Sequence, residues 1–117
     1  MRTEHATDLV FSALAHPARR RILDLLVNAP GASVKDIASH FEFSRIATMK
    51  HLATLEAADL VISEKTGRVR SHYFNAVPIQ LIYDRWTDDY SSFWAGHMAD
   101  IQSRVEARAT ERKKKHA

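Results

Sequence analysis

Length, composition and charge set the first limits on this protein. Its 117 residues, 45% hydrophobic and 26% charged, suit one globular domain with a modest core. The formal net charge is +3, and residues 112–115 alone contribute four cations, so bulk charge identifies no partner. The absence of cysteine excludes disulfides and thiolate metal sites. No apolar run approaches the ~18 residues of a membrane helix, and residues 9–15 are too short for a signal peptide, so we expect a cytoplasmic protein without a membrane segment.

The N-terminal third of the chain predicts two helices. Residues 7–15 have four apolar side chains at helical spacing: Leu9, Val10, Ala13 and Leu14. Pro17 suits the first position of a second helix, which runs to about Asn28 and ends before Pro30 and Gly31. Three arginines at positions 19–21 crowd its first turn, where the helix dipole disfavours cations. We interpret them as a solvated face, with a nearby phosphate as the alternative.

The next two segments have the pattern of a helix-turn-helix. Residues 33–36, Ser-Val-Lys-Asp, resemble a capping box and open a short apolar stripe that extends to Phe41. Ser44 is a suitable N-cap for a longer helix, because its hydroxyl can accept a bond from the first turn. That helix buries the stripe Thr48, Leu52 and Leu55. Because only Glu42 and Phe43 separate the two helices, we expect the second to read DNA.

The exposed side of this predicted reader helix has a basic N-terminal half. After Ser44, it carries residues that are cationic, apolar or small: Arg45, Ile46, Met49, Lys50 and Ala53. Such a face suits the major groove of DNA. Taken alone, it would equally suit an ordinary surface helix with two cations, and the preceding helix favours DNA.

Two extended runs follow, at residues 60–65 and 68–74, and Thr66-Gly67 joins them as a hairpin turn. The hairpin brings three cations to its tip and one face: Lys65, Arg68 and Arg70. Directly after a reader helix, this hairpin predicts the wing of a winged-helix domain, whose cations fit the phosphate backbone or the minor groove. A solubilising edge hairpin is the alternative.

From Pro78 onward, apolar residues recur every three or four positions for about 30 residues, with a break near Asp88 left open. A domain this small cannot cover so long and aromatic a stripe, so we expect a second copy of the chain to do so. The predicted dimer interface combines the first and last helices: Leu9, Ile82, Tyr83, Trp86, Phe93, Trp94, His97 and Ile101. An aromatic pocket for a small ligand is the alternative. We expect one domain over residues 1–110 and a disordered basic tail over residues 111–117.

These motifs together resemble the ArsR/SmtB family of small dimeric winged-helix repressors, over roughly residues 8–105. The resemblance rests on FSALAHPARRRILDLL, on VKDIASHFEFSRIATMKHLATLEAADLV, where Asp59 replaces a glycine of the family, and on GRVRSHYFNAVPIQLIYDRW, which resembles a metal-free branch. It implies a mainly helical fold of about five helices and a two-stranded wing, which dimerises through its first and last helices. It also implies a repressor on a palindromic operator, with DNA contacts from the reader helix and wing: Ser44, Arg45, Met49, Lys50, Lys65, Arg68 and Arg70.

Many members of this family sense metals, and the residues here argue against that role. The last-helix metal site of the family maps onto Asp84, Trp86, His97 and Asp100, and an indole cannot ligate zinc. We therefore predict no metal and no cofactor, and we expect regulation by an unidentified small apolar molecule, by a partner protein or by expression level alone. A metal-responsive repressor with an incomplete site is one alternative, and a winged-helix interaction module without DNA reading is another. No nucleophile–base pair or phosphate-binding glycine loop predicts an enzyme.

Overall fold

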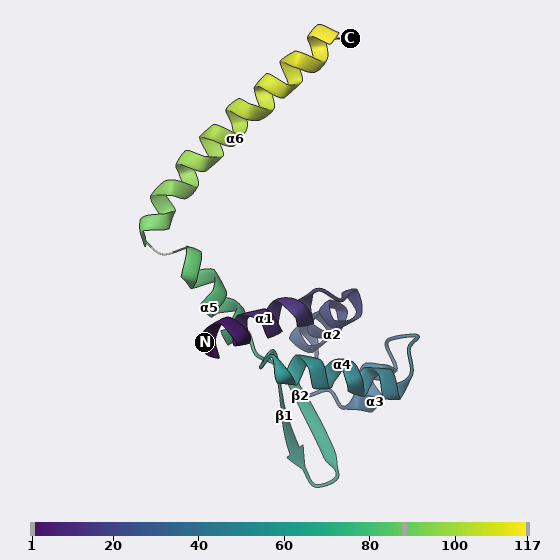
Figure 1. Ribbon diagram of the computed structural model, residues 1–117. Helices are drawn as coiled ribbons and strands as arrows, with labels where there is room; N and C mark the ends of the chain where they lie inside the picture. The colour runs from purple at the N-terminus through teal and green to yellow at the C-terminus, as the bar shows by residue number, and fades with distance from the viewer. Residues whose placement is uncertain (1, 88, 117) are drawn as a thin grey trace. The chain divides into compact units, whose positions relative to one another are not determined.

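A computed structural model describes residues 2–87 and 89–116, and they form six helices and one two-stranded antiparallel sheet (Figure 1). This arrangement confirms the mainly helical winged helix-turn-helix, with six helices instead of about five because the last predicted helix is broken before residue 89. In chain order the elements are α1 Arg2–Leu14, α2 Pro17–Asn28, α3 Val34–Ala38, α4 Arg45–Ala57, β1 Val61–Thr66, β2 Val69–Phe74, α5 Val77–Trp86 and α6 Asp89–His116.

The chain divides into two compact units, residues 1–82 and residues 83–117. The first unit holds α1–α4, the hairpin and the start of α5, and the second holds the end of α5 and α6. The disorder predicted for residues 111–117 is corrected over residues 111–116, which continue α6. The physical reason is composition, because Ala, Glu, Arg and Lys are strong helix formers and no Pro or Gly follows Gly96. Residue 117 lies outside the described residues.

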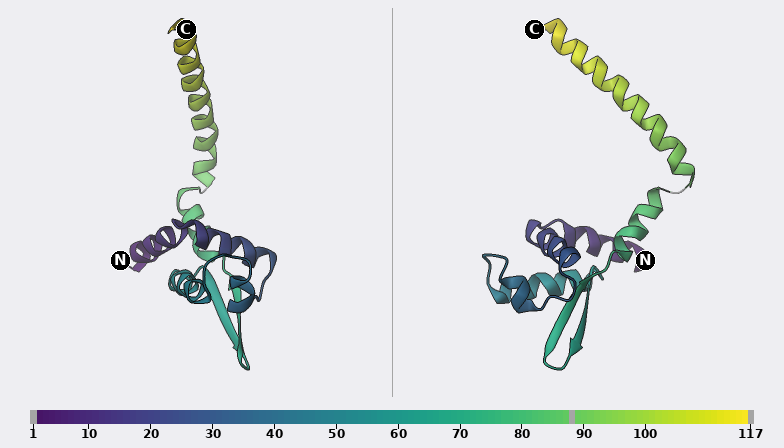
Figure 2. Two further views of the ribbon diagram at one scale, coloured as in Figure 1. Left: turned by 90° about the vertical axis from the view of Figure 1, so that its right-hand side faces the viewer. Right: turned by 180° about the vertical axis from the view of Figure 1, so that it is seen from behind.

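The core of the first unit surrounds α4. Helices α1, α2 and α3 and strand β1 all pack on it, and the apolar side chains of these elements are buried against one another. The most deeply buried members are Ala13, Ile22, Leu26, Ile37, Leu55 and Leu60. In Figures 1 and 2 the β1–β2 hairpin projects away from these four helices, with its turn at the far end.

Two of the three arginines at the start of α2 donate hydrogen bonds to the C-terminal end of α1. Arg19 donates from Nε to the carbonyl oxygen of Ala13 at 2.7 Å, and Arg20 donates from Nη1 to that of Leu14 at 2.7 Å. These carbonyls belong to the last turn of α1, which has no intrahelical donors left for them. The guanidinium of Arg21 lies 5.6 Å from the ring centre of Phe41, a cation–π distance. Arg20 and Arg21 are exposed, as the solvated-face interpretation expects, whereas Arg19 is partly buried.

The capping box at α3 is confirmed, but the helix is shorter than predicted. The backbone N–H of Asp36 donates to Ser33 Oγ at 3.1 Å, and the Asp36 carboxylate accepts from the Ser33 N–H at 3.2 Å. That second bond is the main reason why the pKa of Asp36 is lowered. The Ser39 hydroxyl and His40 Nδ1 both bond to the Asp36 carbonyl, which competes with further helix. Helix α3 therefore ends at Ala38, and the turn before α4 is longer than the two residues expected.

The hairpin is anchored at its base by His72. Its Nδ1 donates to the carbonyl oxygen of Ala32 at 2.9 Å, its backbone N–H donates to the same oxygen, and its side chain is buried. The Gly31 N–H donates to the His72 carbonyl at 2.8 Å, and Gly31 has a φ of +90°. The predicted turn is confirmed, with Gly67 at a φ of +64°. The hairpin is therefore fixed to the loop that precedes α3.

Helix α4 ends in a Schellman motif that places Asp59 in the left-handed region, at a φ of +59°. The Asp59 N–H donates to the Glu56 carbonyl at 2.9 Å, and the Leu60 N–H donates to the Leu55 carbonyl at 3.0 Å. Glycine is the usual residue at this position, since a Cβ makes left-handed backbone costly.

His51 joins α4 to the junction of α1 and α2. Its ring centre lies 4.7 Å from that of His16, and its Nδ1 lies 3.5 Å from Arg19 Nη1. Phe43 packs edge-on against the same ring, at 5.4 Å between centres. Burial lowers the pKa of His51, and the nearby His16 and Arg19 lower it further.

We expect Asp59→Gly to raise the free energy of unfolding by about 0.5–1 kcal/mol, because glycine adopts this backbone conformation without strain. Asp59→Ala removes the same carboxylate and keeps the Cβ, so it should be less stable than the glycine variant by about 1 kcal/mol. Urea denaturation measures both. An alanine variant as stable as the glycine variant would show that the left-handed position carries no strain.

We also expect the free energy of unfolding to fall as the pH is lowered through about 6.5, where an unperturbed histidine titrates. The pKa of His51 is lowered in the folded protein, so the unfolded chain takes up a proton there that the native state resists. In His51→Gln this pH dependence should be weaker. Urea titrations between pH 7.5 and pH 5.5 test the expectation, and equal slopes in the two proteins would contradict it.

Candidate nucleic-acid interface

Helix α4 presents one face to solvent, and its opposite face packs against the core. Thr48, Leu52 and Leu55 are buried, whereas Ile46 is 68% and Met49 55% exposed. Lys50 is also exposed on this outer face. With 13 residues, α4 is about 20 Å long, and an α-helix of this diameter fits the major groove of B-DNA.

The start of α4 is fixed by the side chains of its own first turn. Ser44 Oγ accepts from the Ala47 N–H at 3.1 Å, and the Thr48 hydroxyl donates to the Ser44 carbonyl at 3.0 Å. The predicted N-cap is confirmed. The other N–H groups of a first helical turn have no intrahelical acceptor and carry the positive end of the dipole, so this end of α4 favours an anion.

The hairpin holds its three predicted cations on the surface. Lys65 pairs with Arg70 in the strand register, which places both side chains on the same face of the sheet. The Arg70 guanidinium donates from Nη1 to the Ser63 hydroxyl at 3.0 Å. Arg68 lies in the turn between the strands, and all three cations are exposed. His72 lies two residues after Arg70 on the same face of β2, but it is buried at the base of the hairpin.

A cavity of about 310 Å³ is lined by residues of both the reader helix and the hairpin. Arg45 of α4 lines it with Arg68 and Arg70, and so does Lys35 of α3. Lys35 was not among the site residues predicted from the sequence. The only signal for it was that Lys35 lies off the apolar stripe of α3, a property shared by many surface lysines.

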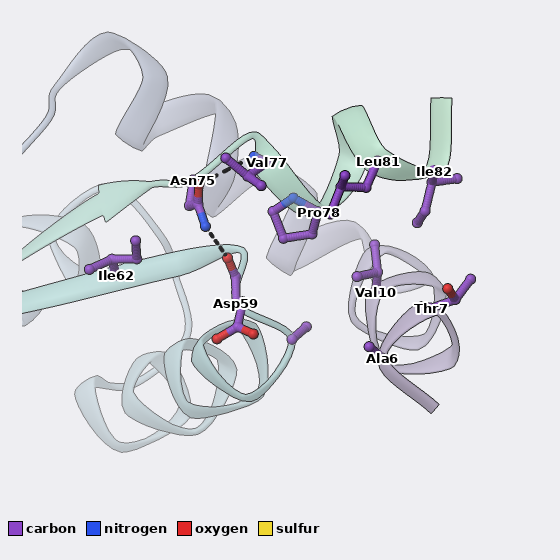
Figure 3. Close-up of a pocket in the computed structure, with 11 residues that line it drawn as sticks. Ala6, Thr7, Val10, Asp59, Ile62, Asn75, Val77, Pro78, Leu81 and Ile82 are labelled. Carbon is purple, nitrogen blue, oxygen red and sulfur yellow. Dashed lines mark hydrogen bonds between the residues drawn. The ribbon is translucent and has the colours of Figure 1, made fainter. Parts of the chain in front are cut away.

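A second cavity, of about 320 Å³, lies where α1, the end of α4, the hairpin and the start of α5 meet. Figure 3 shows Asn75 beside it, donating to the Asp59 carbonyl at 2.8 Å and accepting from the Val77 N–H at 3.2 Å. Its walls are mostly apolar, with Val10, Ile62, Pro78, Leu81 and Ile82 among them. One side chain therefore connects the end of the reader helix to the start of α5.

The residues predicted for a dimer interface fall in both units. Leu9 and Ile82 pack partly against the core of the first unit. In the second unit five are exposed, namely Tyr83, Trp86, Phe93, Trp94 and His97, and Ile101 is partly buried. Phe93 and His97 both meet the Trp94 ring edge-on, with centres 5.9 Å and 5.5 Å apart. On α6 the predicted residues thus form an aromatic surface cluster.

Two further properties concern metals and membranes. Among the side chains that the structure describes, at residues 4–87 and 93–114, no three from His, Asp or Glu, including Asp84, His97 and Asp100, lie close enough together to hold a metal ion. None of the described helices is both long enough and apolar enough to span a bilayer.

Comparisons with known proteins agree with this geometry. Residues 14–64 match a family model described as a helix-turn-helix domain. The chain is 34% identical over 71 residues to the transcriptional repressor SdpR of Bacillus subtilis. The aligned residues cover 61% of this chain and 78% of SdpR. Among solved structures, the ArsR family transcriptional regulator RHA00566 is 29% identical with a TM-score of 0.65, over 79% of this chain and 93% of that one.

A third protein, the homodimeric winged helix-turn-helix DNA-binding domain of Mb0332 from Mycobacterium bovis, shares the fold. Its TM-score is 0.59 at 24% identity, over 66% of this chain and 71% of that one. The exposed face of α4, the hairpin beside it and these similarities lead to one conclusion. The chain belongs to the ArsR family of winged helix-turn-helix transcriptional regulators, which bind DNA.

Proposed function

We propose that this regulator is a repressor that acts as a homodimer on a palindromic operator. One observation carries the proposal: α4 exposes Ile46, Met49 and Lys50 on a helix whose opposite face is locked into the core. A rigid helix with an exposed face of this kind can recognise a base sequence in the major groove. The similarity to SdpR, which is named a transcriptional repressor, supports repression over activation.

In this proposal the two parts of the interface have different tasks. Lys50 can donate to the O6 and N7 acceptors of a guanine, and Ile46 and Met49 can contact thymine methyl groups in the major groove. Ser44 and Arg45 approach the DNA at the start of α4. The hairpin cations Lys65, Arg68 and Arg70 approach phosphates beside the groove, which sets affinity without reading sequence.

A second copy of the chain is the proposed partner of α6. Its exposed apolar side chains include Phe93 at 75%, Met98 at 49% and Val105 at 57%. Trp94, Met98, Ile101 and Val105 alternate at spacings of four and three, the pattern by which two helices pack along a seam. Apolar patches of this kind on a regulator mark an interaction surface. The homodimeric state of Mb0332 supports the same assembly.

For regulation, we keep the small apolar inducer as part of the proposal. The cavity beside Asn75 supports it, because its walls are mostly apolar and touch both the end of α4 and the start of α5 (Figure 3). A ligand with a different affinity for two arrangements of these elements would shift the reader helix between them.

We expect Lys50→Ala to weaken binding to operator DNA by about 1–3 kcal/mol and to leave binding to a shuffled duplex nearly unchanged. Lys65→Ala is the matched control, and it should weaken both duplexes alike because it acts on phosphate. Gel shifts with the DNA upstream of the protein's own gene, beside its shuffled counterpart, measure these effects. Equal losses for Lys50→Ala on both duplexes would remove Lys50 from base reading.

We expect sedimentation to show a dimer at micromolar concentration and Ile101→Asp to convert it to a monomer, because a carboxylate in an apolar seam is costly to bury. Ser103→Asp adds the same charge to an exposed position outside the seam and should leave the dimer intact. A wild-type protein that sediments as a monomer would contradict both the dimer and the palindromic operator.

A further inference from the structure

We propose that Lys35, Arg45, Arg68 and Arg70 together hold one phosphate of the DNA backbone, in the cavity that lies between α3, the start of α4 and the hairpin. This inference rests on the proposed function, since it names the part of the DNA that this cavity binds. It adds Lys35 to the DNA interface, and it assigns Arg45 to a phosphate of the DNA backbone and not to the bases.

The first support is convergence of residues that are far apart in sequence. The cavity of about 310 Å³ is lined from three segments, residues 33–35, residue 45 and residues 68–70. Four of its seven lining residues are cations, and none is an acid: Ser33, Val34, Lys35, Arg45, Arg68, Val69 and Arg70. Like charges gathered around one small space repel one another, so the arrangement is most favourable when an anion occupies that space.

The second support is that, in the part of the chain that the structure describes, three of these four cations make no side-chain hydrogen bond or ion pair, unlike other arginines of the same unit. Arg19 and Arg20 donate to the last carbonyls of α1, and Arg21 lies over the Phe41 ring. Within the described residues, by contrast, no side-chain hydrogen bond or ion pair engages Lys35, Arg45 or Arg68. Arg70 donates one bond, to Ser63, and keeps its other donors.

The third support is that the backbone around the cavity is held in place before any ligand arrives. The Ser33–Asp36 capping box fixes the turn that carries Lys35, and it ties the Asp36 carboxylate to a backbone N–H. Ser44 fixes the turn that carries Arg45. His72 fixes the hairpin to the loop before α3. Ordering three segments in advance removes much of the entropy cost of binding.

The position of Arg45 on α4 agrees with this assignment. It lies two helical turns before the buried Leu52, so it sits at the edge of the buried stripe, whereas Lys50 lies on the outer face. A phosphate held there would contact the reader helix and the hairpin at once and would set the depth at which Lys50 enters the groove.

The number of phosphates can be counted from the salt dependence of binding. Each phosphate that a protein neutralises contributes about 0.9 to the slope of log affinity against log salt. We would measure this slope by fluorescence anisotropy on a shuffled duplex, for the wild type, for Lys35→Ala, Arg45→Ala, Arg68→Ala and Arg70→Ala, and for the quadruple variant. All four side chains are exposed, and circular dichroism checks that each variant keeps its fold.

One shared phosphate predicts that the quadruple variant lowers the magnitude of the slope by about 0.9, as for one lost phosphate. Four separate phosphates predict a loss of about 3.6, four times that value, and this result would overturn the shared site. Adding Lys65→Ala, which does not line the cavity, should lower the slope further by about 0.9. Arg68→Lys keeps the charge and should keep the slope.

The outcomes separate this inference from the proposed function. A wild type that binds DNA, with an unchanged slope in the quadruple variant, would overturn the phosphate site and leave the regulator intact. A wild type that binds neither duplex would overturn the proposed function and this inference with it. If the quadruple variant unfolds, the double variant Lys35→Ala/Arg68→Ala decides: a loss of no more than about 0.9 supports one shared phosphate, and a loss of about 1.8 contradicts it.

Discussion

The interaction on which the rest of the structure depends is the packing of one stripe of α4 into the core. Thr48, Leu52 and Leu55 are buried against α1, α2, α3 and β1. Because that stripe fixes the rotation of the helix about its axis, it also fixes which residues face outward. A helix free to rotate would present no constant set of side chains to DNA, so sequence reading depends on this burial before it depends on any polar group.

The ends of α4 are held as firmly as its buried stripe. Ser44 caps the start, and the Schellman motif at Asp59 closes the end. From there Asn75 extends the connection to the first turn of α5, and the backbone N–H of Asn75 also donates to the Leu60 carbonyl at 2.9 Å. Asn75 therefore links the start of α5 to the end of the reader helix through both its side chain and its backbone. This gives the proposed inducer cavity a physical route to the DNA-binding face.

Features set by local chemistry were predictable from the sequence. The cap at Ser44, the box at Ser33 and the turn at Gly67 each depend on residues within a few positions of one another, and all are confirmed. Contacts between distant segments were not predictable in this way. Nothing local shows that Arg19 closes α1, or that Lys35 and Arg45 meet the hairpin around one cavity. The early end of α3 depended on two side chains that bond to one carbonyl, a competition that apolar spacing does not reveal.

The structure explains why the family resemblance leads one to expect glycine at position 59, where this chain has Asp59. The family has glycine there, and the structure shows a left-handed backbone at that position. The contacts with DNA and with a second copy stay predictions, since they depend on molecules that the chain meets outside its own fold.

The most direct test of sequence reading by α4 is a selection of bound duplexes from a library with a randomised centre. We expect an enriched inverted repeat, with half-sites separated by one helical turn of about 10–10.5 base pairs or a multiple of it. Duplexes retained without any sequence preference would contradict sequence reading, because they would show that the outer face of α4 binds phosphate and reads no bases.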